Sequence, residues 1–118
     1  MREIGSRAKN QPPPPHVVFE SLTEPDRPGG RPWLALLHDE HPPEVLQARE
    51  PDLVVWGSLW DRRPDARVRF DLAADTDGTL LRWTLLVDEP VPDAALTGHL
   101  RKRLNQLVNA ELRYSYGS

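Results

Sequence analysis

The sequence predicts an α+β domain in which an antiparallel sheet packs against one long C-terminal helix. Three features of the 118 residues support this prediction. Residues 93–114 repeat apolar side chains at helical spacing, residues 53–87 repeat them at strand spacing, and proline clusters separate the segments that come before. A chain of this length has room for one hydrophobic core, so we expect a single domain over residues 1–118.

The C-terminal helix is the most regular element of the pattern. Its apolar residues fall on one side of a 3.6-residue helix: Leu96, Leu100, Leu104, Leu107 and Val108. Asp93 suits the N-cap and Gly117 suits the end of the helix. Some twenty residues of helix are about 30 Å long, which is enough to cross a small sheet. The same spacing places the carboxylate of Glu111 among these leucines.

Three strands joined by short turns are predicted before that helix, at residues 53–60, 66–74 and 79–87. The turn at residues 75–78 contains Gly78, which tolerates positive φ. Pairing Ala74 with Thr79 across this turn gives the apolar pairs Leu72–Leu81, Phe70–Trp83 and Val68–Leu85. The same pairing sets Asp71 beside Arg82, and opposite charges favour this register over a slip of one residue.

We extend the register to the preceding strand by pairing Trp60 with Ala66. This predicts that Trp56 lies beside Phe70, so that a row Trp56–Phe70–Trp83 faces the long helix. Core packing is the ordinary role for such aromatic residues. The opposite face of the sheet then carries an apolar set, which suggests a surface for homodimer formation: Val55, Leu59, Leu80 and Leu86.

The N-terminal half is less regular. Residues 1–11 are either an edge strand or a loose segment, and Pro12–Pro15 interrupt regular structure. A short helix is expected at residues 16–22, a second one that begins at Pro32 in residues 31–40, and a strand at residues 44–50.

Composition excludes several classes of function. The net charge is −3, so no overall attraction to nucleic acid or to an anionic membrane is expected. No apolar run approaches the roughly 20 residues of a membrane span, and the N-terminus has no apolar region typical of a secretory signal. The absence of cysteine excludes disulfides and thiolate chemistry, and it fits a cytoplasmic protein. Arginine and proline are abundant, as in proteins of GC-rich bacteria.

Two stretches resemble a known superfamily. PPPPHVVFESLTEP is similar to the opening helix, and DTDGTLLRWTLLV to the late hairpin, of the START, polyketide cyclase and birch-pollen-allergen proteins, which are grouped as SRPBCC. The resemblance covers most of residues 12–116 and implies a helix-grip fold. It also implies an apolar ligand between a curved sheet and the final helix. Full members have seven strands, whereas four or five are predicted here, so we expect a reduced helix-grip domain.

Residues that could support catalysis or metal binding are scattered. His38, Asp39, Glu40 and His41 have metal-capable side chains, but Pro42 opposes the helix that would place both histidines on one face. We therefore expect a solvated helix end. Ser58 lacks a nucleophile elbow, and the run 101–103 (Arg-Lys-Arg) reads as an exposed basic face rather than a nucleic-acid site. The resemblance supplies no catalytic motif, and no catalytic residue, metal or cofactor is expected.

The leading hypothesis is non-catalytic binding of a small apolar or aromatic ligand between sheet and helix. Its predicted site consists of Trp56, Phe70, Trp83 and Leu104 as the apolar wall, with Ser58 and Glu111 as polar anchors. The alternative is an interaction protein whose groove is filled by its own side chains and which binds another copy or another protein. An enzyme of cyclase or isomerase type is the third hypothesis.

Overall fold

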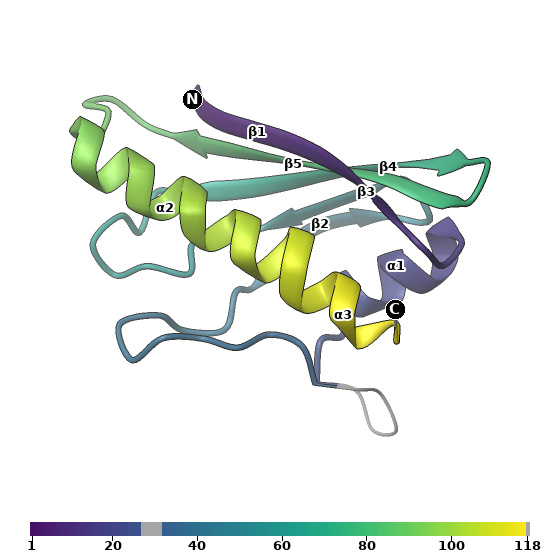
Figure 1. Cartoon of the computed structure of the whole chain (residues 1–118). Helices are drawn as coiled ribbons and strands as arrows, with labels where there is room; N and C mark the ends of the chain where they lie inside the picture. The colour runs from purple at the N-terminus through teal and green to yellow at the C-terminus, as the bar shows by residue number, and fades with distance from the viewer. Residues whose placement is uncertain (27–31, 118) are drawn as a thin grey trace.

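The computed structural model describes residues 1–26 and 32–117. These residues form an antiparallel five-stranded sheet with the order β1-β5-β4-β3-β2, covered on one side by the C-terminal helix (Figure 1). The predicted α+β helix-grip arrangement is confirmed. In chain order the elements are β1 (Arg2–Gln11), α1 (Pro15–Thr23), β2 (Val45–Arg49), β3 (Leu53–Trp56), β4 (Arg67–Asp75), β5 (Gly78–Val87), α2 (Ala94–Gln106), the π-helix η1 (Leu107–Leu112) and α3 (Arg113–Ser115).

The N-terminal segment joins the sheet. It forms β1, an edge strand that pairs along its length with β5. The short helix α1 follows, with Pro15 in its first turn, as the sequence predicts. No helix in the described residues is long and apolar enough to cross a membrane.

The prediction of a second helix at residues 31–40 is wrong for residues 32–40, the part of it that the structure describes. Residues 32–37 have no regular structure, and a turn leads to an isolated bridge between Glu40 and Trp60. Trp33 explains the irregular path, because its indole stacks on Trp56 with centroids 6.0 Å apart and donates to the carbonyl of Ser21. These tertiary contacts override a weak local helical preference.

The hairpin register is confirmed. Strands β4 and β5 pair Ala74 with Thr79, Phe70 with Trp83 and Asp71 with Arg82. Gly78 has φ of +138°, and a side chain there would collide with the backbone of Gln11 and Pro12. Glycine is therefore required at this turn for its conformation and for the close approach of the chain.

The predicted register of the preceding strand is wrong by two residues. Strand β3 sets Val54 opposite Phe70 and Trp56 opposite Val68, and it ends at Trp56 rather than at residue 60. A shift of two residues keeps the faces, so Trp56 still points toward the helix. It reaches Phe70 diagonally in an edge-to-face contact with ring centroids 4.6 Å apart.

The apolar set predicted on the outer face does not form one surface. Leu59 lies beyond the end of β3 and is fully buried in the core. Val55 and Leu86 are half-buried, and Leu80 is exposed. The ion pair of Arg69 with Asp71, and the Ser6–Thr84 contact, lie on the same face and interrupt the apolar residues.

The final helix begins as predicted, with the Asp93 carboxylate accepting the Leu96 amide at 2.8 Å. The π-helix η1 then changes which residues face the sheet. Each residue of an α-helix turns about 100°, and the wider π-turn shifts the later residues by about one position. Leu112 is therefore buried and Glu111 is exposed, so the predicted place of Glu111 among the leucines is wrong.

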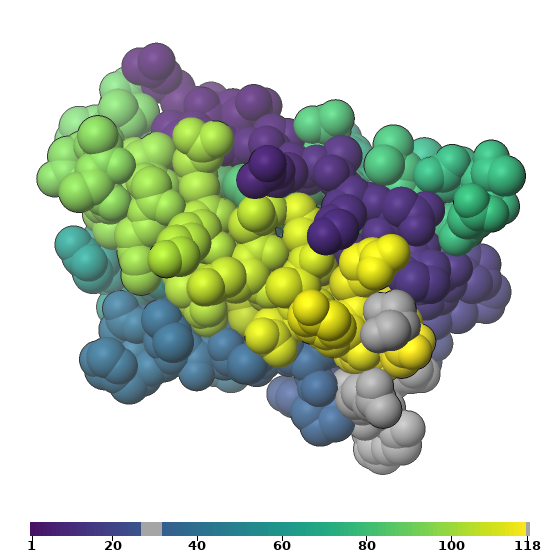
Figure 2. Space-filling view, viewed as in Figure 1, coloured from purple at the N-terminus to yellow at the C-terminus, as the bar shows by residue number. Residues whose placement is uncertain are grey.

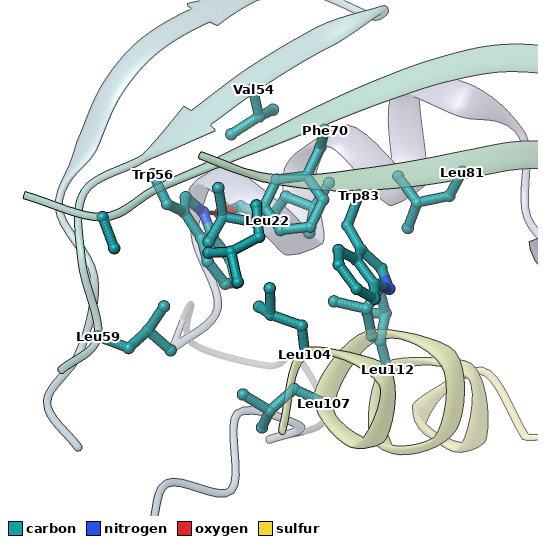
Figure 3. Close-up of a cluster of buried hydrophobic side chains, with 14 of the residues drawn as sticks. Leu22, Val54, Trp56, Leu59, Phe70, Leu81, Trp83, Leu104, Leu107 and Leu112 are labelled. Carbon is teal, nitrogen blue, oxygen red and sulfur yellow. Dashed lines mark hydrogen bonds between the residues drawn. The ribbon is translucent and has the colours of Figure 1, made fainter. Parts of the chain in front are cut away.

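The core occupies the space between sheet and helix (Figure 3). The close-up shows Leu104 and Leu112 of the helix pointing toward the sheet residues Phe70 and Trp83, and Leu107 pointing to the side where Leu59 lies. These leucines are fully buried, as are Leu22 of α1 and Leu59 of the β3–β4 connection. The helix, α1 and an irregular connection thus complete one hydrophobic cluster against the sheet.

Leu104→Ala is expected to lower the free energy of unfolding by roughly 2–5 kcal/mol, because it opens a cavity at the middle of the helix. Chemical denaturation measures this change. A loss below about 1 kcal/mol would mean that the helix does not cover the core.

Candidate functional site

The structure brings together the apolar residues of the predicted site, but as packed core. Trp56, Phe70 and Leu104 have no exposed surface, and Trp83 is 2% exposed. Among four clefts bordered by described residues, Trp83 lines one, whereas Trp56, Phe70 and Leu104 line none. A ligand between sheet and helix would have to displace these side chains.

The two predicted polar anchors lie elsewhere. Ser58 follows β3, where its Oγ is 2.7 Å from the carbonyl oxygen of Arg63 and 3.0 Å from that of Trp60. It also accepts the Trp60 amide at 2.9 Å, so the hydroxyl orders the β3–β4 connection. Glu111 faces solvent on η1. Neither side chain projects into the aromatic cluster as an anchor.

A buried ion pair joins the irregular segment before β2 to the long helix. The side chain of Glu40 is fully buried and that of Arg103 is 9% exposed. Arg103 Nη2 donates to Glu40 Oε1 at 2.7 Å, and Nε donates to Oε2 at 2.9 Å. The Trp60 indole donates to the same Oε2 at 2.8 Å, and Arg103 also donates to the carbonyl of Ala35. The expected solvated helix end at residues 38–41 is therefore wrong for Glu40, as is the exposed basic face for Arg103.

Hydrogen bonding decides the charge state of Glu40. Burial alone raises the pKa of this carboxyl, but donors from Arg103, from the Leu37 amide and from Trp60 outweigh it. The pKa of Glu40 is consequently lowered from its usual 4.5, and the bond to Glu40 raises the pKa of Arg103. Both groups are charged at neutral pH, and each satisfies the other.

Arg103→Met should lower the free energy of unfolding by roughly 3–5 kcal/mol, because it leaves the Glu40 carboxylate buried without its cation. The matched control is Arg101→Met on the same helix, where Arg101 is exposed and a change within about 0.5 kcal/mol is expected. The double variant Glu40→Leu with Arg103→Met should lose less than the sum of the single losses. If Arg103→Met and Arg101→Met lower the free energy of unfolding equally, the buried pair of Glu40 and Arg103 does not have the stabilising role described here.

The contribution of Glu40 should depend on pH. Its pKa is lower in the folded protein, so the stabilisation is present above the unfolded value and is lost as pH falls through the folded pKa. Denaturation of the wild type and of Glu40→Gln should therefore differ most near neutrality. The difference should narrow below about pH 4.5. A difference that stays constant down to pH 2–3 would rule out this titration.

The cleft in which Trp83 participates lies between β1 and α2. It measures about 530 Å³ and opens to solvent. We call it the edge cleft and define it by its lining: Ser6, Arg7, Trp83, Gly98, Arg101, Lys102 and Asn105. Figure 2 shows β1 in purple beside the green part of the helix on this face. Its volume lies within the range of small-molecule sites, roughly 300–1,000 Å³.

Trp83 differs from the other three tryptophans in its hydrogen bonding. The indole nitrogens of Trp33, Trp56 and Trp60 donate to Ser21, Leu22 and Glu40, in that order. The Nε1 of Trp83 is buried and has no acceptor among the described residues. Buried indole N–H groups usually have a partner, and this one belongs to a residue that lines the edge cleft.

A second cleft of about 480 Å³ lies near the start of β2. Its lining includes Ser58, His41 and Asp61, with His41 Nδ1 3.2 Å from Asp61 Oδ1. This is not an arrangement for nucleophilic catalysis, because the Ser58 hydroxyl is committed to backbone carbonyls and Asp61 is 93% exposed. Among the described residues, no group of three or more histidine, aspartate or glutamate side chains is placed to hold a metal ion.

Sequence reasoning missed most of the edge cleft. Arg101 and Lys102 were visible as part of a basic run, yet nothing in the local pattern separated them from the buried Arg103. Arg7 belongs to β1, and only its pairing with Trp83 across the sheet brings it to the cleft. Gly98 lies inside α2, and a Cβ added there would meet nothing within 4 Å.

Comparison with known proteins confirms the fold. No family model and no curated protein matches the sequence. CalU16 from Micromonospora echinospora is 18% identical with a TM-score of 0.64, over 92% of this chain and 70% of that one. The Aha1 dimer from Colwellia psychrerythraea is 13% identical with a TM-score of 0.66, over 96% and 94%. An AHSA1-like protein from Rhizobium etli is 20% identical with a TM-score of 0.50, over 91% and 82%.

At sequence identities of 13–20%, the structural similarity to these proteins establishes the fold of this chain and not its function. The chain has the helix-grip type of fold that the sequence resemblance implies, in a form with five strands among the described residues.

Proposed function

We propose that this protein is a non-catalytic binding protein whose ligand occupies the edge cleft, beside Trp83, rather than the space between sheet and helix. The proposal keeps the expected small ligand with an aromatic part and moves its site. It agrees with the ligand-binding role that the sequence resemblance implies for this fold.

The filled interior argues against a ligand site between the sheet and the helix, which is where the sequence predicted it. Phe70, Trp83 and Leu104 are buried in one contiguous cluster, so a ligand among them must displace side chains that are already packed. Protein interiors are close-packed, and displacing such groups sacrifices contacts that a small ligand has to replace. The edge cleft is open to solvent, so a ligand can enter it without displacing Phe70 or Leu104.

The unpaired indole nitrogen of Trp83 is the observation on which the proposal rests. A ligand acceptor in the edge cleft would supply the partner that the described residues do not provide. Trp83 is the one member of the predicted site that also lines this cleft.

Gly98→Leu tests the location of the site. The new side chain projects into open space and occupies the edge cleft, so the fluorescent probe 1-anilinonaphthalene-8-sulfonate should bind at least about tenfold more weakly than to the wild type. Fluorescence titration measures this change. Stability should rise by up to about 1 kcal/mol, because glycine is unfavourable inside a helix.

Gly57→Ala is the matched control, because Gly57 lines the second cleft and an added Cβ makes ordinary contacts there at 3.7 Å. This variant should bind the probe as the wild type does. Probe binding that survives Gly98→Leu would remove the edge cleft from the proposal. A wild type that does not bind the probe would remove the small-ligand function.

Self-association is the second candidate function. One solved protein of similar fold is described as a dimer, and this chain exposes Val45 and Leu46 on the edge strand β2. However, β2 is short and bulged between Val45 and Gln47, features that discourage pairing between sheet edges. A concentration-dependent mass in sedimentation, together with absent probe binding, would favour this candidate.

A further inference from the structure

We infer that the ligand of the edge cleft is an anion, in which a carboxylate, sulfonate or phosphate group is joined to a flat apolar ring. The inference rests on the proposed binding function and adds the chemical class of the ligand. It follows from the charge, the hydrogen-bonding groups and the shape of the cleft.

Positive charge gathers at this cleft in a protein whose net charge is −3. Arg7 comes from β1, and Arg101 and Lys102 come from α2, while the described lining contains no carboxylate. Two elements distant in sequence therefore place three cations around one hollow. A cleft with charges of one sign concentrates the field and attracts ions of the opposite sign.

The three cations of the edge cleft are not neutralised by a carboxylate of the described residues, a property that they share with Lys9, Arg62, Arg67, Arg82 and Arg113. Arg2, Arg49, Arg63, Arg69 and Arg103 each form an ion pair with a carboxylate. Arg7, Arg101 and Lys102 form none with the described residues, although 18 acidic residues are present in the chain. Their charges remain available for a ligand.

Gly5 helps to place one of the charges. A Cβ at this position would lie 2.7 Å from Cγ of Arg101, so the aliphatic stem of Arg101 lies directly against the backbone of β1. Contact along the stem reduces the freedom of the side chain and keeps its guanidinium near the cleft. Less conformational entropy is then lost when an anion is bound.

The hydrogen-bonding groups agree with the charge. Arg7, Arg101, Lys102 and the Trp83 indole can donate hydrogen bonds and cannot accept them. The Asn105 side-chain oxygen already accepts from Asn109 at 2.7 Å. A ligand group rich in acceptor oxygens complements this set, and bonds from arginine to such anions are among the stronger ones in proteins. Trp83, which is 2% exposed, is the one aromatic residue of the described lining that a ring could contact.

A pair of probes tests the inference. 1-Anilinonaphthalene-8-sulfonate and N-phenyl-1-naphthylamine share the same rings, and only the first carries an anionic group. The anionic probe should bind about tenfold or more tightly than the neutral one, and its affinity should fall as salt is raised from about 0.02 M to about 0.5 M. The amide signal of Gly98 should shift in NMR spectra, whereas that of Gly57 in the second cleft should not.

Charge variants assign the effect to the cleft. Arg7→Gln and Arg101→Gln should each raise the dissociation constant of the anionic probe about three- to tenfold and leave that of the neutral probe within about twofold. Arg62→Gln, at an exposed arginine outside the cleft lining, should change neither value. Unchanged unfolding midpoints would exclude loss of folding as the cause.

The outcomes separate the inference from the proposed function. Equal binding of both probes at the Gly98 site, unaffected by Arg7→Gln and Arg101→Gln, would overturn the anion requirement and leave the binding function standing. If neither probe binds, both the anion requirement and the proposed binding function are overturned. Inorganic phosphate at millimolar concentration should compete only weakly with the anionic probe. If phosphate displaces the probe as effectively as an aromatic carboxylate does, the requirement for a ring is overturned.

Discussion

The buried pair of Glu40 and Arg103 is the constraint that fixes the long helix over the sheet. Its two hydrogen bonds, of 2.7 and 2.9 Å, connect an irregular segment to α2 across 63 positions of sequence. Trp60 adds the β3–β4 connection to the same carboxylate. Because a charge in this place is costly without its partner, the segment before β2, the connection and the helix are required to keep one arrangement.

With the helix in this position, the space between sheet and helix is filled by core side chains, and a cleft is left beside the edge strand β1. Trp56, Phe70 and Leu104 complete the core between the two layers, so the fold is occupied where its resemblance implies a ligand. Strand β1 lies at the end of the sheet, where the helix passes beside it and leaves the edge cleft. The reduced sheet thus favours a lateral site, lined by cations from both elements, over an enclosed one.

Local rules were sufficient for the fold and for one hairpin, but not for the candidate site. Apolar alternation was sufficient to predict the β4–β5 register, because a slip of one residue would turn the apolar face to solvent. Asp71 and Arg82 lie opposite each other as predicted, but Asp71 forms its ion pair with Arg69, and Arg82 donates to Ser6. The π-turn that removes Glu111 from the core accompanies a contact from Gln11, whose amide donates to the carbonyl of Val108. Such a contact joins the two ends of the chain and leaves no periodic signal. The approach of Arg7 to the helix is likewise a product of tertiary structure.

The most direct test of this account is a crystal structure of the complex with 1-anilinonaphthalene-8-sulfonate. The account predicts density for the rings between β1 and α2, against Trp83, with the sulfonate within about 3 Å of a nitrogen of Arg7, Arg101 or Lys102. The core rotamers of Phe70 and Leu104 should be unchanged. Density for the probe between Phe70 and Leu104, with the helix displaced from the sheet, would contradict the account.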